Sequence, residues 1–194
     1  MNKSLDLRIS NTDKMIKEAF LDLLDTIGFE KISIINLTKK AKISRTTFYI
    51  HYKDKYDLLE QIENEILDGL KNIAADFSLD EIITNGLSDE KSYSMLLRVY
   101  EYIKDNQKFF KSIMCNNEDP YFYYKLSEAM KLTYSQNIHI YKLKIPDHYA
   151  IAFAIGVQTS IISEWIKSGM KETPQEIVSI VTQIMNNVPK NIHN

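Results

Sequence analysis

The side chains best suited to chemistry gather in one short stretch, "SRTTFYIHYKDKYDLL", which covers residues 44–59. At its start, Arg45, Thr46 and Thr47 combine a guanidinium fork with two hydroxyls. Such groups recognise base edges in the major groove of duplex DNA. A guanidinium can donate two parallel hydrogen bonds to a guanine, and a threonine can hydrogen-bond a base or contact a thymine methyl. The pattern therefore predicts sequence-reading contacts from these three residues.

A second group of polar side chains around this stretch suits the phosphate backbone. Tyr49, His51 and Lys55 carry hydrogen-bond donors of the kind that hold a protein on a duplex without reading its sequence. Ser33 begins the preceding predicted helix, where a hydroxyl and free backbone amides favour an anion. Lys53 adds a positive charge at the rim. We therefore predict backbone contacts from these five residues.

Positive charge is concentrated around this stretch, although the whole chain is slightly acidic. Residues 31–56 contain seven Lys and Arg against one acidic residue, a local charge of +6. Since the 194-residue chain has a formal net charge of −2, the remaining residues together carry −8. A compact basic patch on an acidic body favours a local polyanion site. The plainer alternative is a solvated lysine face that binds nothing.

These side chains need a scaffold, and the apolar pattern around them predicts three short helices followed by a longer one. The first begins near Asn11, and the second covers residues 33–41. After a three-residue turn, Ser44 caps a third helix over residues 45–51, and Asp54 caps the fourth. The second and third helices have the dimensions of a helix-turn-helix. Their contact is assigned to Ile34, Leu37, Ala41, Ile43 and Phe48.

The rest of the chain predicts further helices and no pair of strands. Only 5 Gly and 4 Pro interrupt the whole sequence, which is too few for a sandwich rich in tight turns. "SLDE" (78–81) and "TPQE" (173–176) both have the form of a helix start. We predict an all-α fold with an N-terminal three-helix DNA-binding domain (1–60, of which 1–9 form a flexible arm) and a C-terminal helical domain (61–194). Helices of the second domain are expected at about 90–105, 121–140, 147–168 and 174–188.

The N-terminal third of the sequence also resembles a known family. "LTKKAKISRTTFYIHYKDKYDLL" is similar to the helix-turn-helix signature of the TetR/AcrR family of bacterial transcriptional regulators, and the resemblance covers about residues 9–62. Lys42 stands where the family usually has glycine, so a positive φ there costs roughly 1 kcal/mol. Ile50 often has a basic residue in its place, and Tyr52 is predicted to be buried. The matching positions are Ala41, Ile43, Ser44, Thr47, Phe48, Tyr49, His51, Tyr52, Lys55, Leu58 and Leu59.

The resemblance implies that the C-terminal domain binds a small inducer and forms a homodimer. Independently, "HYAIAFAIGVQTSIISEW" is apolar around most of its circumference, which indicates burial on more than one side. The alternative is a buried central helix without a partner. "GVQTSIISEWIKSGMKETPQEIV" also resembles the C-terminal region of a subset of these regulators. The candidates for the dimer interface are Ala152, Phe153, Gly156, Ser160, Ile177, Val181 and Ile184.

Aromatic residues are concentrated in the middle of the chain. Nine of the 12 tyrosines lie between residues 93 and 149. Aromatic walls with hydroxyl groups suit a pocket for a flat or amphipathic ligand, whereas the alternative is that these rings only pack the core. The candidates for the ligand pocket are Tyr93, Tyr100, Phe110, Tyr123, Tyr124 and Tyr134.

Other functional classes find little support in the sequence. It contains no spaced acid/base pair, no metal-ligand spacing and no glycine-rich phosphate loop, so we expect no enzyme activity, metal or cofactor. A single cysteine, an N-terminus without a signal-like apolar core and the lack of a long apolar run predict a soluble cytoplasmic protein without membrane contact.

The combined prediction is a ligand-responsive, homodimeric regulator of transcription. Its partners are a palindromic double-stranded DNA operator and an unknown small-molecule inducer that releases it, which makes it a repressor. The alternatives are an activator or co-regulator of the same fold that acts through a protein partner, or an enzyme with a fortuitous helix-turn-helix.

Overall fold

The computed structural model describes residues 3–75, 90–115, 120–135 and 146–187, and no strand occurs in these ranges. The predicted all-α class is thereby confirmed. The elements are α1 (Lys3–Ile27), the 3-10 helix η1 (Phe29–Lys31), α2 (Ile34–Ala41), α3 (Arg45–His51), α4 (Lys55–Ala74), α6 (Glu90–Asp105), α7 (Gln107–Cys115), α8 (Pro120–Ser135), α9 (Asp147–Lys167) and α10 (Pro174–Asn187).

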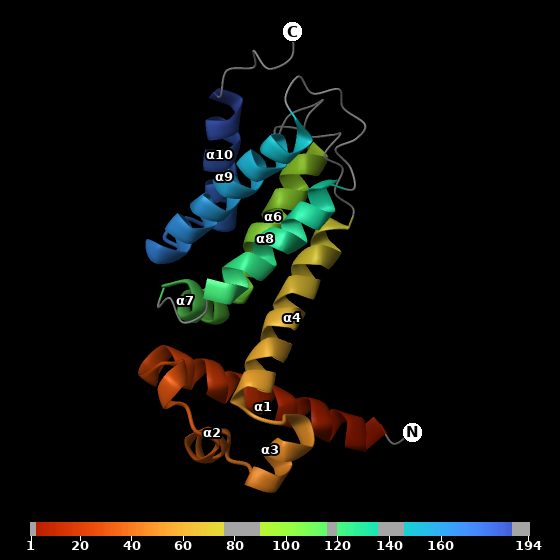
Figure 1. Cartoon of the computed structure of the whole chain (residues 1–194), viewed down its shortest axis with the longest axis vertical. Helices are drawn as coiled ribbons and strands as arrows, with labels where there is room; N and C mark the ends of the chain where they lie inside the picture. Colours follow the sequence, from red (N-terminus) through yellow and green to blue (C-terminus); the bar gives the residue numbers. More distant parts are fainter. Residues whose placement is uncertain (1–2, 76–89, 116–119, 136–145, 188–194) are drawn as a thin grey trace.

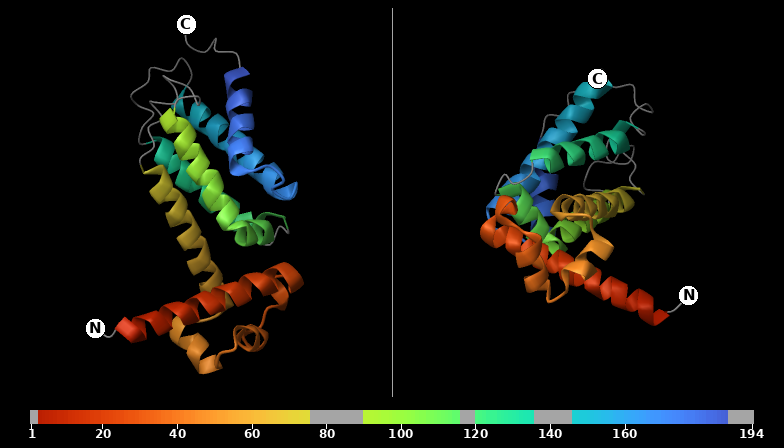
Figure 2. Two further views of the ribbon diagram at one scale, coloured as in Figure 1. Left: turned by 180° about the vertical axis from the view of Figure 1, so that it is seen from behind. Right: turned by 60° about the horizontal axis from the view of Figure 1, so that its bottom comes forward.

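The helices form a small unit at one end of the molecule and a larger bundle at the other (Figure 1). In the small unit α1 packs on α2, and α2 packs on α3. Helix α4 rises from this unit into the bundle, where it packs on α6 and α8. Helix α9 contacts α7 and α8, and α10 packs on α6. The two units also meet directly, because α7 lies against α1. Figure 2 shows that the N-terminal end of α1 extends past the other helices.

Side-chain caps explain where the short helices of the small unit begin. The Ser33 hydroxyl accepts a hydrogen bond from the Asn36 amide (3.2 Å), and the Asn36 side chain accepts one from the Ser33 amide (2.9 Å). The Ser44 hydroxyl accepts from the Thr47 amide at 3.0 Å. Asp54 accepts from two amides in the first turn of α4. Each cap satisfies donors that the first turn leaves open, so these boundaries agree with the sequence prediction.

The turn between α2 and α3 has the backbone conformation that a glycine would favour. Lys42 adopts φ 56° and ψ 40°, in the left-handed region. Its amide donates to the Lys39 carbonyl (3.3 Å), and the Ile43 amide donates to the Thr38 carbonyl (3.0 Å). The positive φ expected for Lys42 is confirmed. These two hydrogen bonds help to hold the turn against a conformational cost of about 1–2 kcal/mol.

The N-terminal arm is one prediction that the structure corrects. Residues 1–9 were expected to be flexible, but α1 is helical from Lys3 and runs without a break to Ile27. The segment 3–27 contains no glycine or proline, and extending an existing helix fixes few dihedrals for each hydrogen bond gained. The polar run that includes Asn11 therefore lies inside the helix rather than at its cap.

One helix of the bundle was not expected: α7 follows α6 after the single residue Asn106. The helix predicted at about 147–168 is α9, whose N-cap position is occupied by Pro146 without a side-chain cap, so Asp147 lies in the first turn. Residues 78–81, 136–140 and 188, on which other predictions fall, are outside the described residues.

One hydrophobic core runs through both units. It includes Phe20 and Phe48 in the small unit, Leu58 and Ile66 along α4, and Trp165 in the bundle. Since burial of each such side chain contributes about 1.5–3 kcal/mol, the core resists separation of the units. The expected division at residue 60 therefore falls within α4, whose buried residues lie on both sides of it.

Candidate nucleic-acid interface

The helix-turn-helix is held by the apolar contacts that the sequence predicted. Leu37 and Phe48 are fully buried, and Ala41 is nearly so. Ile34 and Ile43 are partly buried and pack against the same core. Because these residues fix one side of α3 against α2, the opposite side of α3 faces solvent.

The outward side of α3 carries the residues that were assigned to base edges. Arg45 and Thr46 are exposed. Thr47 is half-buried, and its hydroxyl shares a 2.8 Å hydrogen bond with Ser44, so the cap already uses part of its hydrogen-bonding capacity. Ile50, where a basic residue is common in the resembled family, is 75% exposed.

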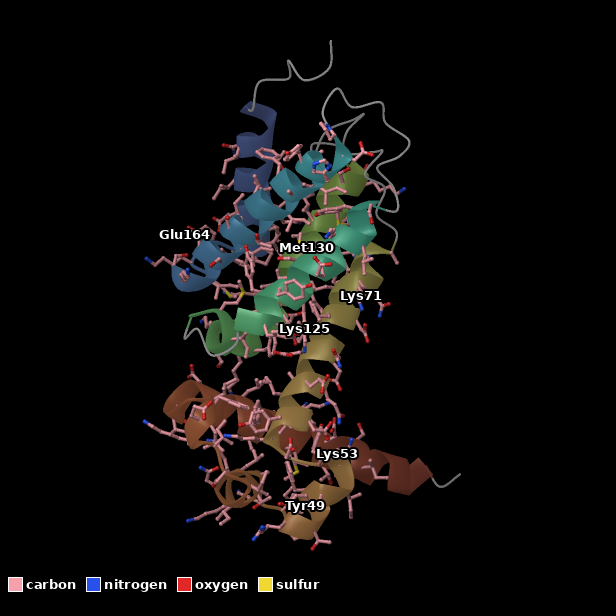
Figure 3. The ribbon with its side chains drawn as sticks, in the orientation of Figure 1. Tyr49, Lys53, Lys71, Lys125, Met130 and Glu164 are labelled. Carbon is pink, nitrogen blue, oxygen red and sulfur yellow. The ribbon has the colours of Figure 1, made fainter. Side chains whose placement is uncertain are left out.

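The residues at and just after the end of α3 differ in how far they are exposed to solvent. Tyr49 is 50% exposed, and its ring meets Phe48 edge-on at 5.5 Å. Figure 3 places Tyr49 at the end of the molecule farthest from the bundle, and Lys53 lies in the same small unit. His51 is half-buried and stacks on Tyr52 with ring centroids 6.2 Å apart. Lys53 is exposed, and its backbone amide donates to Asp57 at 2.8 Å.

Two residues assigned to phosphate have internal partners as well. The Lys55 ammonium donates to the carbonyls of Phe29 (3.0 Å) and Glu30 (3.2 Å), and it lies 4.5 Å from the centre of the Phe29 ring. Lys55 therefore joins α4 to η1, in addition to the phosphate contact predicted from the sequence. The backbone amide of Ser33 is bonded to Asn36, so it is not open to an anion.

A polar network ties the end of α3 to two longer helices. Tyr52 is buried, as predicted, and its hydroxyl donates to the Asp13 carboxylate on α1. Burial, followed by the hydrogen bond to Asp13, raises the pKa of the Tyr52 hydroxyl, so it remains a neutral donor. Lys17 contacts Asp13 at 2.6 Å and also Glu65 on α4. The orientation of α3 is therefore coupled to both α1 and α4.

A second polar link joins the small unit to the bundle. Asp22 on α1 pairs with Lys108 of α7 and, at 3.1 Å, with Lys40 of α2. The hydrogen bond from Lys108, assisted by that from Lys40, lowers the pKa of the Asp22 carboxyl. One carboxylate thus contacts a helix of the helix-turn-helix and a helix of the bundle.

The bundle contains a cavity of about 80 Å³ between α4, α6, α7, α8 and α9. Of the predicted pocket residues, Phe110 and Tyr134 line it. Tyr100 is fully buried against Trp165, with ring centroids 5.4 Å apart, and Tyr93 is half-buried in the core. The remaining two face elsewhere: Tyr123 bonds Thr159 through its hydroxyl (2.8 Å), and Tyr124 is 59% exposed.

Sequence reasoning missed most of this cavity because its walls are largely aliphatic. The polar lining residues are Lys71, Thr133, Tyr134 and Gln158, and the Tyr134 hydroxyl donates to the Gln158 side-chain oxygen. The missed signal lies in α4, where apolar residues continue beyond the small unit. Prominent apolar lining residues are Leu67, Leu70, Met95, Val99, Leu126 and Met130.

The predicted interface residues divide between the surface and the core of the bundle. On α9, Ala152, Phe153, Gly156 and Ser160 are exposed along one face. On α10, Ile184 is exposed and Ile180, which was not a candidate, is exposed too. Ile177 and Val181 are buried within the protomer. Among the described helices, α9 is long and apolar enough to cross a membrane. Core helices of soluble proteins can have the same length and composition, so this is only weak evidence for a membrane span.

Comparison with known proteins agrees with this architecture. Residues 90–187 match the family TetR_C_8, described as the C-terminal region of transcriptional regulators. The chain is 29% identical, over 80% of its length, to the HTH-type transcriptional regulator YxbF of Bacillus subtilis. It is 32% identical, over 53% of its length, to the dhaKLM operon transcriptional activator DhaS of Lactococcus lactis. It spans 40% and 48% of these two relatives, respectively.

Solved structures show the same fold. A TetR-family transcriptional regulator from Syntrophomonas wolfei superposes with a TM-score of 0.67 at 17% identity, covering 95% of this chain and 99% of that one. The dihydroxyacetone kinase operon activator DhaS superposes with a TM-score of 0.59 at 20% identity, covering 94% and 98%. With a family match over half of its length and a helix-turn-helix at one end, the chain belongs to the TetR family of transcriptional regulators.

Proposed function

We propose that this regulator acts as a homodimer on a palindromic DNA operator, as a repressor that a small-molecule inducer releases. The observation that carries the proposal is the outward face of α3, where Arg45, Thr46 and Tyr49 are all exposed. Figure 3 shows Tyr49 at the end of the molecule farthest from the bundle. An α-helix fits the major groove, and the first turn of a recognition helix reaches base edges.

A dimer is needed because one helix-turn-helix reads only a half-site. Two recognition helices related by a two-fold axis fit successive major grooves when they lie about 34–36 Å apart, or a multiple of that distance. The exposed face of α9 suits this pairing, because Gly156 leaves open space where a side chain would otherwise lie and Phe153 is 55% exposed. Ile180 and Ile184 extend the apolar surface onto α10.

Replacing Phe153 with glutamate should therefore convert the dimer to a monomer at micromolar concentration. The substitution places one charge from each protomer in a contact that must exclude water, which is unfavourable without a partner. Sedimentation velocity measures the change directly. Ile35→Glu is the matched control, since Ile35 is also exposed (66%) but lies on α2 in the small unit. A Phe153→Glu protein that sediments with the control would refute this interface.

The inducer is proposed to bind in the cavity and to act through α4. The C-terminal half of α4 supplies Leu67 and Leu70 to the cavity wall, whereas its N-terminal end is bonded to η1 through Lys55. A ligand that prefers one arrangement of α4 against α8 shifts the dimer toward it. Release from DNA requires different affinities for the two states, and by reciprocity DNA weakens inducer binding by the same factor.

Arg45 and Lys53 are expected to contribute to DNA binding in different ways. Arg45→Ala should cost about 1–3 kcal/mol at one base pair and relax the choice of base there. Lys53→Ala should weaken binding to all sequences about equally and lower the salt-dependence slope by about 1. Both are measured by fluorescence anisotropy on a palindromic duplex that the protein selects from a random pool, at several salt concentrations.

The control for this pair of variants is Lys131→Ala. Lys131 is an exposed residue of α8 in the bundle. It removes the same charge from the chain without touching the proposed interface. Equal losses on selected and random duplexes for both Arg45→Ala and Lys53→Ala would contradict the division of roles. Losses no larger than that of the control would contradict DNA contact by α3.

The second candidate function is transcriptional activation. The observation in its favour is that the Lactococcus relative is described as an operon activator. The same dimer on the same operator would then recruit transcription rather than block it. A reporter gene behind the selected operator distinguishes the two, because its expression falls with a repressor and rises with an activator.

A further inference from the structure

We propose that the cavity between α4 and α8 takes a medium-length aliphatic monocarboxylate, whose tail lies among the aliphatic walls and whose carboxylate meets Lys71. This inference rests on the proposed ligand response and specifies the ligand's chemistry. Figure 3 shows Met130 on α8 and Lys71 on α4, and the proposed ligand would lie between these two helices.

The size of the cavity limits the length of the ligand. A water-sized group needs about 10–15 Å³ of such space, so about 80 Å³ holds roughly five to eight of them. Leu67, Leu70 and Leu126 supply flexible aliphatic wall, and Met95 and Met130 adapt to irregular shapes. An apolar chain of that length therefore matches the cavity better than a large, flat ring system does.

The charges around the cavity select the head group. Within the described part of the chain, the lining contains one cation, Lys71, and no carboxylate. Burial raises the pKa of the Tyr134 hydroxyl, which therefore stays neutral. A cationic ligand would find no opposite charge in the lining, whereas an anionic one finds Lys71.

The Lys71 ammonium would contact an anion at the mouth of the cavity rather than in its interior. Its side chain is 51% exposed, and its ammonium pairs with Asp68 at 3.1 Å. Surface pairs of this kind contribute little, so a ligand carboxylate can compete for the ammonium. Inside, the Tyr134 hydroxyl donates to Gln158, so this internal donor already has a protein partner. A molecule with a single polar end suits this arrangement.

The test uses the intact dimer and three probes that share a chain length: octanoate, 1-octanol and octylammonium. Calorimetry should show octanoate binding about five- to tenfold more tightly than octylammonium. Lys71→Gln should remove most of that difference and leave 1-octanol unchanged. Ala129→Phe, which fills the cavity, should abolish binding of all three. Lys131→Gln, which lies on α8 outside the lining, should behave as the unmodified protein.

The outcomes separate this inference from the proposed function. Octylammonium binding as tightly as octanoate, or equal octanoate affinity for Lys71→Gln and the unmodified protein, overturns the ligand class. If Ala129→Phe does not fold, as judged by circular dichroism, the octanoate affinity of Lys71→Gln still tests the ligand class, because Lys71 is exposed and its substitution should not affect folding. A protein that binds its selected duplex but ignores octanoate refutes only this inference. One that binds octanoate but no duplex refutes the DNA-binding proposal instead.

Discussion

Lys125→Met is expected to lower the free energy of unfolding by about 3–5 kcal/mol, far more than removal of any surface lysine. Lys125 on α8 pairs with Glu63 on α4 at 2.7 Å, and the Glu63 side chain is only 2% exposed. Removal of the Lys125 ammonium takes this ion pair away from a carboxylate that is buried, and loss of one member of a buried pair is strongly destabilising. Glu63 lies one turn before Leu67 on α4, and Lys125 is next to Leu126 on α8, and both leucines line the cavity. The pair therefore joins α4 to α8 beside the cavity, and Figure 3 shows Lys125 nearer to the small unit than Met130.

Urea unfolding at a fixed protomer concentration measures this loss, since the proposed dimerisation would link stability to concentration. The midpoint should fall while the slope stays constant. Lys131→Met is the control, because Lys131 and Glu128 form an exposed pair at 3.4 Å that contributes within about 1 kcal/mol. The double variant Glu63→Leu with Lys125→Met should recover most of the loss. Equal midpoints for Lys125→Met and Lys131→Met would contradict a special role for the buried pair.

Trp165→Ala should be comparably destabilising, by about 3–5 kcal/mol, because it empties a large site in a packed core. Trp165 is almost fully buried at the end of α9, and its ring meets Tyr100 of α6 edge-on at 5.4 Å. Its indole N–H donates to the Glu172 carbonyl at 3.1 Å. The residue therefore holds the corner between α9 and α10, the two helices proposed to form the dimer.

Trp165→Phe is the matched variant, because it retains a ring against Tyr100 but removes the hydrogen bond to Glu172. A smaller loss of about 1–2 kcal/mol is expected for it. Circular dichroism in urea should be used, since Trp165 is the only tryptophan and its fluorescence disappears with the substitution. A Trp165→Ala protein no less stable than Trp165→Phe would show that the corner does not depend on ring packing.

The helix-turn-helix could be predicted closely because its determinants are local. The ends of α2 and α3 follow from caps and a turn within three residues of each other, as at Ser44 and Lys42. The start of the last helix was equally clear, since Thr173 and Glu176 bond each other reciprocally at 2.8–3.2 Å. Such signals do not depend on the rest of the fold.

The bundle was harder to predict because the direction of a side chain depends on which helices are its neighbours. Ile177 and Ile184 belong to one apolar stripe, yet Ile177 is buried on α10 and Ile184 is exposed. Likewise, aromatic composition suggested six pocket residues, of which only Phe110 and Tyr134 line the cavity, because most of its walls are aliphatic residues of α4, α6 and α8. Periodicity identifies an apolar helix face but not the element that covers it.

The length of α4 gives the molecule a mechanical property. With 20 residues, this helix is a rod of about 30 Å, and a tilt of about 5° about one end displaces the other by about 2.5 Å. In a two-fold assembly both rods swing, so the change in separation at the far ends can approach twice that value. In the proposed dimer, the angle at which α4 crosses α8, beside the Glu63–Lys125 ion pair, would therefore affect the spacing of the two recognition helices.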